Sequence, residues 1–425
     1  MDYNNIYKSY MYSYPHKTAY RELNNINFTD YVPQIRSEGS GLYFHIPFCS
    51  SKCGYCNLFS ITGTNREYHL KYITAMEEQM ASILCKTGEV NWNSITIGGG
   101  TPLLLDEYLL ERLLQLAYKT VGNGKNIHSC IETSPCETTI EKLNLLKKFD
   151  IKRVSIGVQS FNDEELKKLG RQHNSQQVRR ALILLQDYNF DCLNIDLIYG
   201  IDGQTQADLK NSVDNVLKYN PDEIFIYPLY IRTGTILHRI NSTVLSAVET
   251  YEQYIFLKDY LKSKGFYQTS MRRFCRKVPD INESCGFENT LSVGCGGRSY
   301  LGNLHFCTPY ASSRKKCVEI IDEYIINPFK DEIKHGILLD IEEQKRRFSI
   351  KNLLYYCGVS QKDYRDMFKN DFIIDFSFVS QLIEAGYIAL DNGFFKLTPQ
   401  GMGFSDYIGT LFISPEIAKL MEEWS

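Results

Sequence analysis

Short apolar segments alternate with longer segments of helical periodicity between residues 42 and 264. The apolar segments are 42–46, 94–97, 127–132, 153–157, 192–198 and 223–229. The helical segments are 66–88, 106–120, 137–148, 162–169 with 175–188, 205–218 and 247–264. Strands that alternate with helices predict a parallel sheet built from βα units. We count about six such units, and a closed barrel needs eight. The pattern therefore predicts an α/β fold with a partial, open (β/α)6 barrel.

The segments on either side of this alternation differ from it. Residues 1–38 are polar and aromatic and contain Pro15 and Pro33, which predicts an N-terminal arm on a larger body. The barrel is predicted over 39–265, and the glycine-containing segment 266–328 is predicted to extend it and close the site. Residues 329–425 predict a C-terminal winged-helix-like α+β domain, because helical segments precede "AGYIALDNGFFKLT", a hairpin with an Asn-Gly turn.

Composition and charge argue against several classes of partner. The 425 residues carry a net charge of −3, so we expect no bulk attraction to nucleic acid or anionic membrane. In the C-terminal domain, "KRR" stands close to "EE", which favours a lid over a DNA-binding role. We expect no signal peptide, and no run approaches eighteen apolar residues. The 13 cysteines do not resemble a secreted disulfide framework, so we expect a reducing, cytoplasmic location.

Three cysteines follow the first predicted strand in "GLYFHIPFCSSKCGYCNLFSI". Cys49, Cys53 and Cys56 have the spacing C-x3-C-x2-C. Thiolates are soft ligands that select zinc, copper(I) or iron–sulfur clusters. A structural zinc site needs a fourth ligand, and none stands at similar spacing, His45 and His69 being the nearest histidines. Three cysteines on a [4Fe–4S] cluster would leave one iron open to an outside ligand. Zinc with a remote ligand and three buried thiols remain alternatives.

A second motif, "ITIGGGTPLLL", follows the second predicted strand. Glycine lets a backbone approach a ligand closely, so Gly98–Gly100 with Thr101 indicate a second binding loop. A tight turn between strand and helix is the alternative.

The cysteine motif, with Tyr55 before its last cysteine, resembles the signature of the radical S-adenosylmethionine (SAM) superfamily. The resemblance implies that SAM occupies the open iron and is cleaved reductively to a 5′-deoxyadenosyl radical, with an electron donor such as flavodoxin or ferredoxin. A narrower resemblance rests on "IGGGTP", "IETSP", "RVSIGVQSFNDEELKKLGRQH" and "NIDLIYGIDGQT". These segments are similar to oxygen-independent coproporphyrinogen III oxidases and their relatives, which include haem chaperones and radical methylases.

The resemblance also implies site residues. Cys49, Cys53 and Cys56 would hold the cluster. The SAM-binding residues it implies are Tyr43, near the cluster; Gly99, Gly100 and Thr101, at the amino group; Glu132; Gln159 and Asp196, at the ribose or methionine; and Arg171, at the carboxylate. Guanidinium groups bind carboxylates bidentately, which suits the last assignment.

The sequence departs from the oxidases at one position. They are expected to carry a cysteine two residues after the third cluster ligand, where this chain has Leu58. The resemblance therefore implies a radical SAM oxidoreductase of a small, tetrapyrrole-like organic substrate, as in porphyrin biosynthesis, with the exact reaction open. The alternatives are a methylase that uses a second SAM and a haem carrier on the same scaffold.

Three further features invite interpretation. Gly294, Gly296 and Gly297 would admit a second SAM or the substrate, or serve packing. Arg272 and Arg273 would pair substrate carboxylates, or lie on the surface. Finally, a second cluster could be considered for Cys275, Cys285, Cys295 and Cys307. Their spacings of ten, ten and twelve are unlike those of known cluster motifs, so buried or free thiols are expected.

Overall fold

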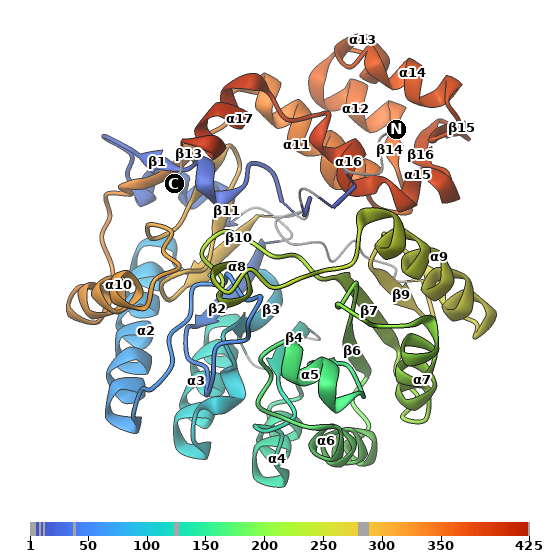
Figure 1. Cartoon of the computed structure of the whole chain (residues 1–425). Helices are drawn as coiled ribbons and strands as arrows, with labels where there is room; N and C mark the ends of the chain where they lie inside the picture. The colour runs from blue at the N-terminus through green and yellow to red at the C-terminus, as the bar shows by residue number, and fades with distance from the viewer. Residues whose placement is uncertain are drawn as a thin grey trace.

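The computed structural model describes residues 6–7, 10–11, 13–36, 40–122, 127–278 and 289–423. Within these residues a sheet of 13 strands has the order β1-β13-β12-β11-β10-β2-β3-β4-β5-β6-β7-β9-β8. Its six central strands are parallel and follow chain order (Figure 1). They are β2 (Ser40–Ile46), β3 (Trp92–Gly99), β4 (His128–Thr133), β5 (Arg153–Gln159), β6 (Cys192–Tyr199) and β7 (Glu223–Pro228). The predicted α/β class and the six predicted strands are confirmed.

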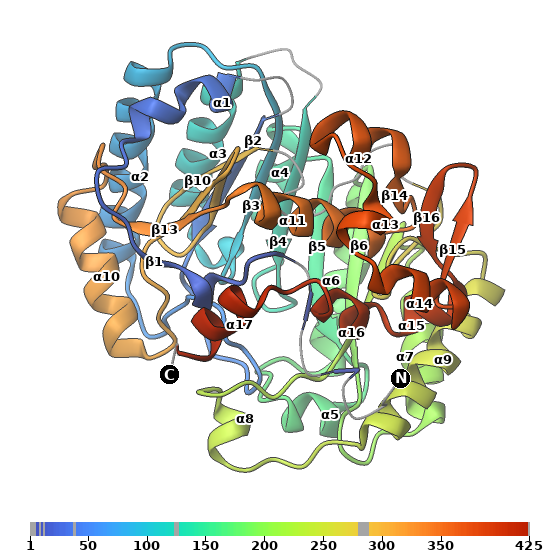
Figure 2. The same ribbon diagram turned by 90° about the horizontal axis from the view of Figure 1, so that it is seen from above.

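Helices cover the outer face of these strands (Figure 1). They are α2 (Arg66–Thr87), α3 (Glu107–Val121), α4 (Ile140–Lys148), α6 (Ser175–Tyr188), α7 (Gln206–Leu217) and α9 (Ala247–Ser263). The short helices α5 (Asp163–Lys168) and α8 (Ile236–Arg239) lie at the loop end of the strands (Figure 2). Side-chain caps fix several starts, since Asn174, Thr205 and Ser246 each form a capping box with the third residue of the following helix. On β5 the outward Val154, Ile156 and Val158 are fully buried, so the polar residues between them face inward.

Short strands extend the sheet beyond both sides of the central six. On one side β9 (Arg273–Cys275) pairs antiparallel with β7 and carries β8 (Tyr267–Gln268). On the other side β10 (Thr290–Val293) runs parallel to β2. The strands that follow β10 outward are β11 (Ser299–Leu301), β12 (Leu304–Phe306), β13 (His335–Leu338) and β1 (Arg21–Glu22). In the described residues no ladder joins β8 to β1, so the sheet stays open.

The N-terminal arm contains short elements that pack against helices. They are η2 (Lys17–Ala19), η3 (Phe28–Tyr31) and α1 (Val32–Arg36). Helix α1 packs against α2, which also contacts α10 (Arg314–Ile326), and η2 packs against α17 (Pro415–Glu422). Strand β1 of the arm pairs with β13, with Arg21 opposite Gly336. The arm is therefore joined to the body by main-chain hydrogen bonds.

The C-terminal segment combines helices with a small antiparallel sheet of order β14-β16-β15. Its helices are α11 (Ile341–Leu353), α12 (Gln361–Phe368), α13 (Phe372–Asp375), α14 (Phe378–Glu384), α15 (Pro399–Gly403), α16 (Ser405–Thr410) and α17 (Pro415–Glu422), and its strands are β14 (Val359–Ser360), β15 (Ile388–Asp391) and β16 (Phe394–Leu397). Asn392 and Gly393 have positive φ angles of 49° and 82°, so the predicted Asn-Gly hairpin is confirmed.

The arm and the C-terminal segment meet over the open side of the sheet (Figures 1 and 2). The backbone N–H of Met11 donates to Oδ1 of Asp406 in α16 at 3.0 Å, and the hydroxyl of Tyr14 donates to the carboxylate of Glu343 in α11. None of the helices described here combines the length and the apolar character needed to cross a membrane.

Candidate functional site

The inner face of the sheet and its surrounding loops enclose one large cavity of about 1780 Å³. All eleven residues predicted to bind the cluster or SAM line it. They are Tyr43, Cys49, Cys53, Cys56, Gly99, Gly100, Thr101, Glu132, Gln159, Arg171 and Asp196. The structure thus brings together residues from the first five βα units of the chain.

Strand register sorts the polar residues of the inner face into layers. Glu132 is opposite Ser155, Ser155 is opposite Asn194, and Asn194 is opposite Glu223. The next layer towards the carboxyl ends of the strands holds Gly157 opposite Asp196. Side chains alternate along a strand, so charged groups two residues apart face the same cavity.

The cysteine loop is held by main-chain hydrogen bonds to separate segments. Cys49 N–H donates to the carbonyl of Ile61 at 3.0 Å, and Gly54 N–H donates to the carbonyl of Leu169 at 2.8 Å. Leu237 N–H in α8 donates to the carbonyl of Gly54 at 2.9 Å. The positions of the three thiols are therefore set by the fold and not by the loop alone.

The three cysteine thiols are partly buried at the cavity wall. Among the described residues, no three His, Cys, Asp or Glu side chains are arranged to hold a single metal ion. Three thiolates on one [4Fe–4S] cluster would each bind a different iron. Burial, together with Cys56, raises the pKa of the Cys49 thiol to about 11, and burial, together with Cys53, raises the pKa of Cys56. Metal binding must therefore release protons from these thiols.

The glycine motif packs directly against the cysteine loop. The N–H groups of Gly100 and Thr101 donate to the carbonyls of Ile46 and Phe48, at 2.7 and 2.8 Å. A Cβ on Gly100 would lie 2.5 Å from the Phe48 carbonyl oxygen and 2.9 Å from Cys49 Sγ. Gly99, at φ 112°, donates its N–H to Oε2 of Glu132 at 3.2 Å. These N–H groups are used within the protein, which leaves the carbonyls as the groups for an amino group of a ligand.

We expect Gly100→Ala to disturb the cysteine loop, because the added methyl group meets backbone that has no room to move. Overpacking of this kind costs about 1–3 kcal/mol of unfolding free energy. The variant should also hold less iron after anaerobic reconstitution than the wild-type protein. Gly122→Ala is the control, since nothing lies within 4 Å of its Cβ although its φ is 82°; its iron content should not fall. Equal iron content in the two variants would contradict the prediction.

Arg171 joins the cysteine loop to the strand ends. Its Nη1 donates to Cys53 Sγ at 3.1 Å and its Nη2 donates to the Gly157 carbonyl at 3.0 Å. The guanidinium carbon lies 6.0 Å from the ring centroid of Tyr55. The buried Nε of Arg171 has no hydrogen-bond partner among the described residues. A buried donor without a partner is costly, so this nitrogen suits an anionic ligand in the cavity.

Two carboxyl groups of the cavity hold their protons unusually strongly. Burial raises the pKa of Glu132 to about 7, against the opposing hydrogen bond from Gly99. Burial raises the pKa of Asp196 to about 6, and the side chain of Asn194, which donates to Oδ1 at 2.8 Å, limits the rise. Such shifts occur at functional sites, where buried polar groups await a ligand.

The Glu132 shift predicts a pH dependence of stability. Its carboxyl group ionises near pH 4.5 in the unfolded chain but near pH 7 in the folded chain. The folded state binds the extra proton in this window, so the free energy of unfolding falls as pH rises through it. Glu132→Gln keeps an acceptor for Gly99 and removes the charge, so it should exceed the wild type in stability by about 1–3 kcal/mol above pH 7. In urea titrations this difference should shrink towards pH 5; a difference independent of pH would refute the assignment.

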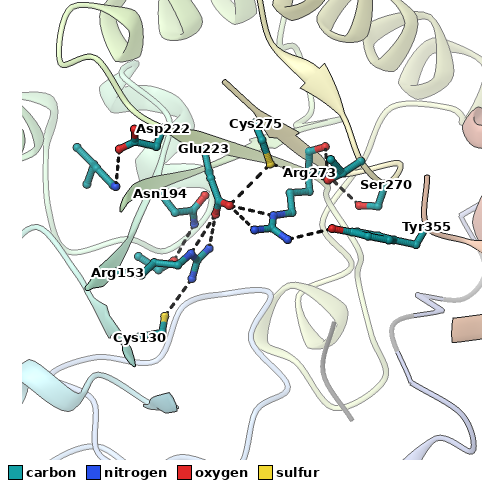
Figure 3. Close-up of polar contacts among 12 residues, drawn as sticks. Cys130, Arg153, Asn194, Asp222, Glu223, Ser270, Arg273, Cys275 and Tyr355 are labelled. Atoms are coloured by element: carbon teal, nitrogen blue, oxygen red, sulfur yellow. Dashed lines mark hydrogen bonds and ion pairs between the residues drawn. The ribbon is translucent and has the colours of Figure 1, made fainter. Parts of the chain in front are cut away.

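The predicted substrate role of Arg272 is wrong, and so is the alternative that Arg272 and Arg273 lie on the surface. Both Arg272 and Arg273 are buried, with 7% and 6% of their surface exposed. Arg272 pairs with Asp406 of α16 and also donates to the hydroxyl of Tyr230. Arg273 lines the cavity but is bound to Glu223, and its Nη1 donates to the hydroxyl of Tyr355 at 3.3 Å (Figure 3). The two guanidinium groups serve the packing of the C-terminal segment and of the inner face.

Glu223 is the centre of a buried network that sequence reasoning missed (Figure 3). Its Oε2 accepts from Nη2 of Arg153 at 2.8 Å, and its Oε1 accepts from Arg273. Nη1 of Arg153 also donates to Cys130 Sγ at 3.0 Å. The signal was present in the sequence, since Arg153 and Glu223 alternate with apolar residues as Glu132 and Asp196 do.

Close packing explains why glycines stand at three positions of "SVGCGGRSYLGN". A Cβ on Gly294 would lie 2.5 Å from the Tyr72 hydroxyl oxygen, one on Gly296 2.4 Å from the Phe59 ring, and one on Gly297 1.9 Å from Ser292 Oγ. Gly296 and Gly297 also line the cavity, so the prediction of a second SAM there stays a prediction.

The four cysteines considered for a second cluster do not gather in the described residues. Cys275 lies on β9 and Cys295 lies shortly after β10, on opposite sides of the six parallel strands. Cys285 lies outside the described residues. The expectation of separate, buried thiols fits Cys275 and Cys295, which are both buried, while Cys307 is half-buried.

Comparison with known proteins agrees with this geometry. Residues 43–216 match the radical SAM superfamily. The haem chaperone HemW of Bacillus subtilis is 26% identical over 84% of this chain and 95% of its own length. The oxygen-independent coproporphyrinogen III oxidase of Escherichia coli is 23% identical over 93% of this chain and 91% of its own length.

A solved structure supports the fold over nearly the whole chain. The coproporphyrinogen III oxidase HemN from Escherichia coli superposes with a TM-score of 0.83 at 21% identity, over 95% of this chain and 97% of the other. The cysteine motif, the cavity and these similarities agree with one another: residues 43–216 match the radical SAM superfamily, and the chain is similar over most of its length to the coproporphyrinogen III oxidase HemN and the haem chaperone HemW.

Proposed function

We propose that this chain binds a [4Fe–4S] cluster and SAM in its cavity and handles a haem-like tetrapyrrole there, as a haem carrier. The observation that carries the proposal is the meeting of eleven predicted cofactor-binding residues in one cavity. When bound and reduced, the cluster supplies the electron that cleaves SAM and yields a 5′-deoxyadenosyl radical. The radical SAM family implies both cofactors.

Each proposed contact uses a group of suitable chemistry. The thiols of Cys49, Cys53 and Cys56 hold the cluster. Arg171 orients the SAM carboxylate through its buried Nε, which has no partner within the described chain. The carbonyls of Gly99 and Gly100 accept from the SAM amino group, because the N–H groups of this loop donate elsewhere.

The remaining contacts orient the rest of the SAM molecule. Glu132 and Asp196 are half-buried carboxyl groups suited to polar hydrogens of SAM, and Gln159 stands at the end of β5. Tyr43 lies beside His45, with its hydroxyl 3.3 Å from Nδ1. Thr101 Oγ1 lies 3.9 Å from Cys49 Sγ, next to the cluster ligands.

We propose the carrier function ahead of oxidative decarboxylation for two reasons. The relatives include several proteins named haem chaperone, matched over nearly their full length. Leu58 also occupies the position where the oxidases are expected to carry a further cysteine. The second candidate is a radical SAM enzyme acting on a tetrapyrrole-like substrate, and the full set of SAM-binding residues favours it.

We further propose that the six βα units act as a partial barrel with the winged-helix-like C-terminal domain as its lid. The contacts of Asp406 support this arrangement. Its carboxylate accepts from Met11 N–H of the arm and pairs with Arg272, and the hydroxyl of Tyr230 after β7 donates to it at 2.5 Å.

One anaerobic experiment separates these functions. The reconstituted protein is reduced with dithionite and incubated with SAM, with and without haem, and the products are analysed by mass spectrometry. A carrier should bind haem, seen as a Soret band, and pass it to apo-myoglobin. No modified tetrapyrrole should form in proportion to the SAM that is cleaved. A modified tetrapyrrole formed together with 5′-deoxyadenosine would establish the enzyme instead, and S-adenosylhomocysteine would indicate a methylase. Arg171→Met should weaken SAM binding while iron is retained. A wild-type protein that binds neither haem nor SAM would refute the proposal.

A further inference from the structure

Basic residues line the described cavity wall on several sides, and three of them stand apart from the acidic residues. Among the described lining residues, every carboxylate lies on β4, β6 or β7 or directly before β6 or β7: Glu132, Asp191, Asp196, Asp222 and Glu223. The arm, the loop after β7 and the loop after β10 contribute Lys17, Arg232 and Arg298 to the same cavity. We call these three residues the basic rim. No acidic residue from the same three segments lines the described cavity wall.

The three cations of the basic rim lie around one imidazole. Burial, together with the positive charges of Lys17, Arg298 and Arg232, lowers the pKa of His16 to about 3. Lys17 and Arg298 also act on each other, and the Cys56 thiol is near enough to affect Lys17. The basic rim therefore faces the end of the cavity where the cysteine loop lies.

Contacts with hydroxyl groups and aromatic rings hold the rim in place. Nη1 of Arg298 donates to Ser13 Oγ at 2.7 Å. The guanidinium carbon of Arg232 lies 4.8 Å from the Tyr230 ring centroid, and Lys17 Nζ lies 3.8 Å from the Tyr310 ring centroid. Aromatic faces attract cations, so these contacts orient the charged groups of the rim.

Lys17 is the unusual member of the rim. Only 7% of its surface is exposed, and within the described part of the chain its ammonium group forms the ring contact but no hydrogen bond or ion pair. Burial, together with the charge of Arg298, lowers its pKa to about 7. A buried ammonium group without an anion is unfavourable, and an anionic ligand in the cavity removes that cost.

We propose that the basic rim binds the carboxylate groups of the tetrapyrrole, with Lys17 and Arg298 as the principal contacts. The inference rests on the proposed function and adds how its ligand is recognised: through at least two carboxylates held at the arm, with the macrocycle in the adjoining cavity. The SAM carboxylate has its own guanidinium in Arg171, which contacts Cys53 of the cysteine loop. Arg272 and Arg273, which the sequence offered for this role, are bound to Asp406 and Glu223.

Binding of tetrapyrroles with and without free carboxylates tests the proposal. The probes are haem, coproporphyrin III with its four carboxylates, and the dimethyl ester of deuteroporphyrin in detergent, with binding followed by absorbance or porphyrin fluorescence. Lys17→Met and Arg298→Met should each lower the affinity for the two acids by about tenfold and leave the affinity for the diester unchanged. Lys17→Arg should restore most of the loss, because it retains the charge.

Lys277→Met is the matched control, since Lys277 lines the same cavity but is exposed and lies beyond the acidic inner face. It should bind the acids as the wild type does. Iron content and circular dichroism of each variant check that the arm still folds. If wild type and Lys17→Met bind the acids equally, or if the wild type binds acids and diester equally, the inference is overturned while the proposed function stands. A wild type that binds no tetrapyrrole overturns both.

Discussion

Cys53→Ala is expected to abolish iron–sulfur cluster binding. A cluster held by three cysteines loses one of its three protein ligands, and no other thiol of the loop can replace it, because Cys49 and Cys56 are needed for their own irons. Cys53 Sγ also accepts a hydrogen bond from Nη1 of Arg171 at 3.1 Å, so the variant loses the contact that links the cluster loop to the SAM-binding arginine. Iron should fall from about four atoms per chain to background, with loss of the charge-transfer absorbance.

A second cysteine of the cavity provides the control for this prediction. Cys136 is exposed and lines the cavity, but it lies outside the cysteine loop. Cys136→Ala should therefore hold as much iron as the wild type. If Cys53→Ala keeps its cluster, or if both variants lose it equally, the three-cysteine assignment is wrong. Thermal unfolding of the apo-proteins shows whether loss of iron reflects a lost ligand or a lost fold.

The central strands could be predicted from the sequence because they are buried on one face throughout. Each predicted strand from β2 to β7 lies within a few residues of its observed bounds, since apolar runs between helical segments mark parallel strands clearly. The outer strands could not be predicted. β1, β8, β9, β11 and β12 have only two or three residues each, too few for a periodic pattern. Their pairing also joins distant segments, as when Arg21 stands opposite Gly336.

The residues of the site also divide into those that the sequence predicts and those that it does not. Its cysteine and glycine loops are contiguous motifs, so their residues could be named before the fold was known. Arg272 could not be assigned correctly because its partner, Asp406, stands 134 positions away in the sequence. Lys17 gave no signal, since a lysine in a polar arm is ordinarily exposed. Only the packing of the arm over the cavity buries it.

Glu223→Gln is expected to be the most destabilising single change on the inner face of the sheet. Glu223 lies between two guanidinium groups, and its side chain is only 6% exposed. Burial alone would raise the pKa of this carboxyl group, but Arg153 and then Arg273 outweigh burial and lower it. The glutamate is therefore ionised and balances two buried positive charges (Figure 3).

The substitution removes that balance while keeping the shape of the side chain. Arg153 and Arg273 would then face each other across a neutral amide, and Arg153 would retain Cys130 as an acceptor. Removing one partner from a buried ion pair leaves an uncompensated charge and costs about 3–5 kcal/mol of unfolding free energy. Urea unfolding of the apo-protein measures this loss directly.

An exposed glutamate with one cationic partner gives the comparison that tests the mechanism. Glu67 pairs with Lys71 at 2.8 Å on the surface of α2, where the two side chains are 71% and 57% exposed. Glu67→Gln should cost far less unfolding free energy than Glu223→Gln, because water and salt screen such an exposed pair. Raising the salt concentration should reduce that small cost and leave the cost of Glu223→Gln nearly unchanged, since buried pairs are screened far less. A Glu223→Gln protein as stable as Glu67→Gln would mean that the two arginines do not depend on this carboxylate for their burial.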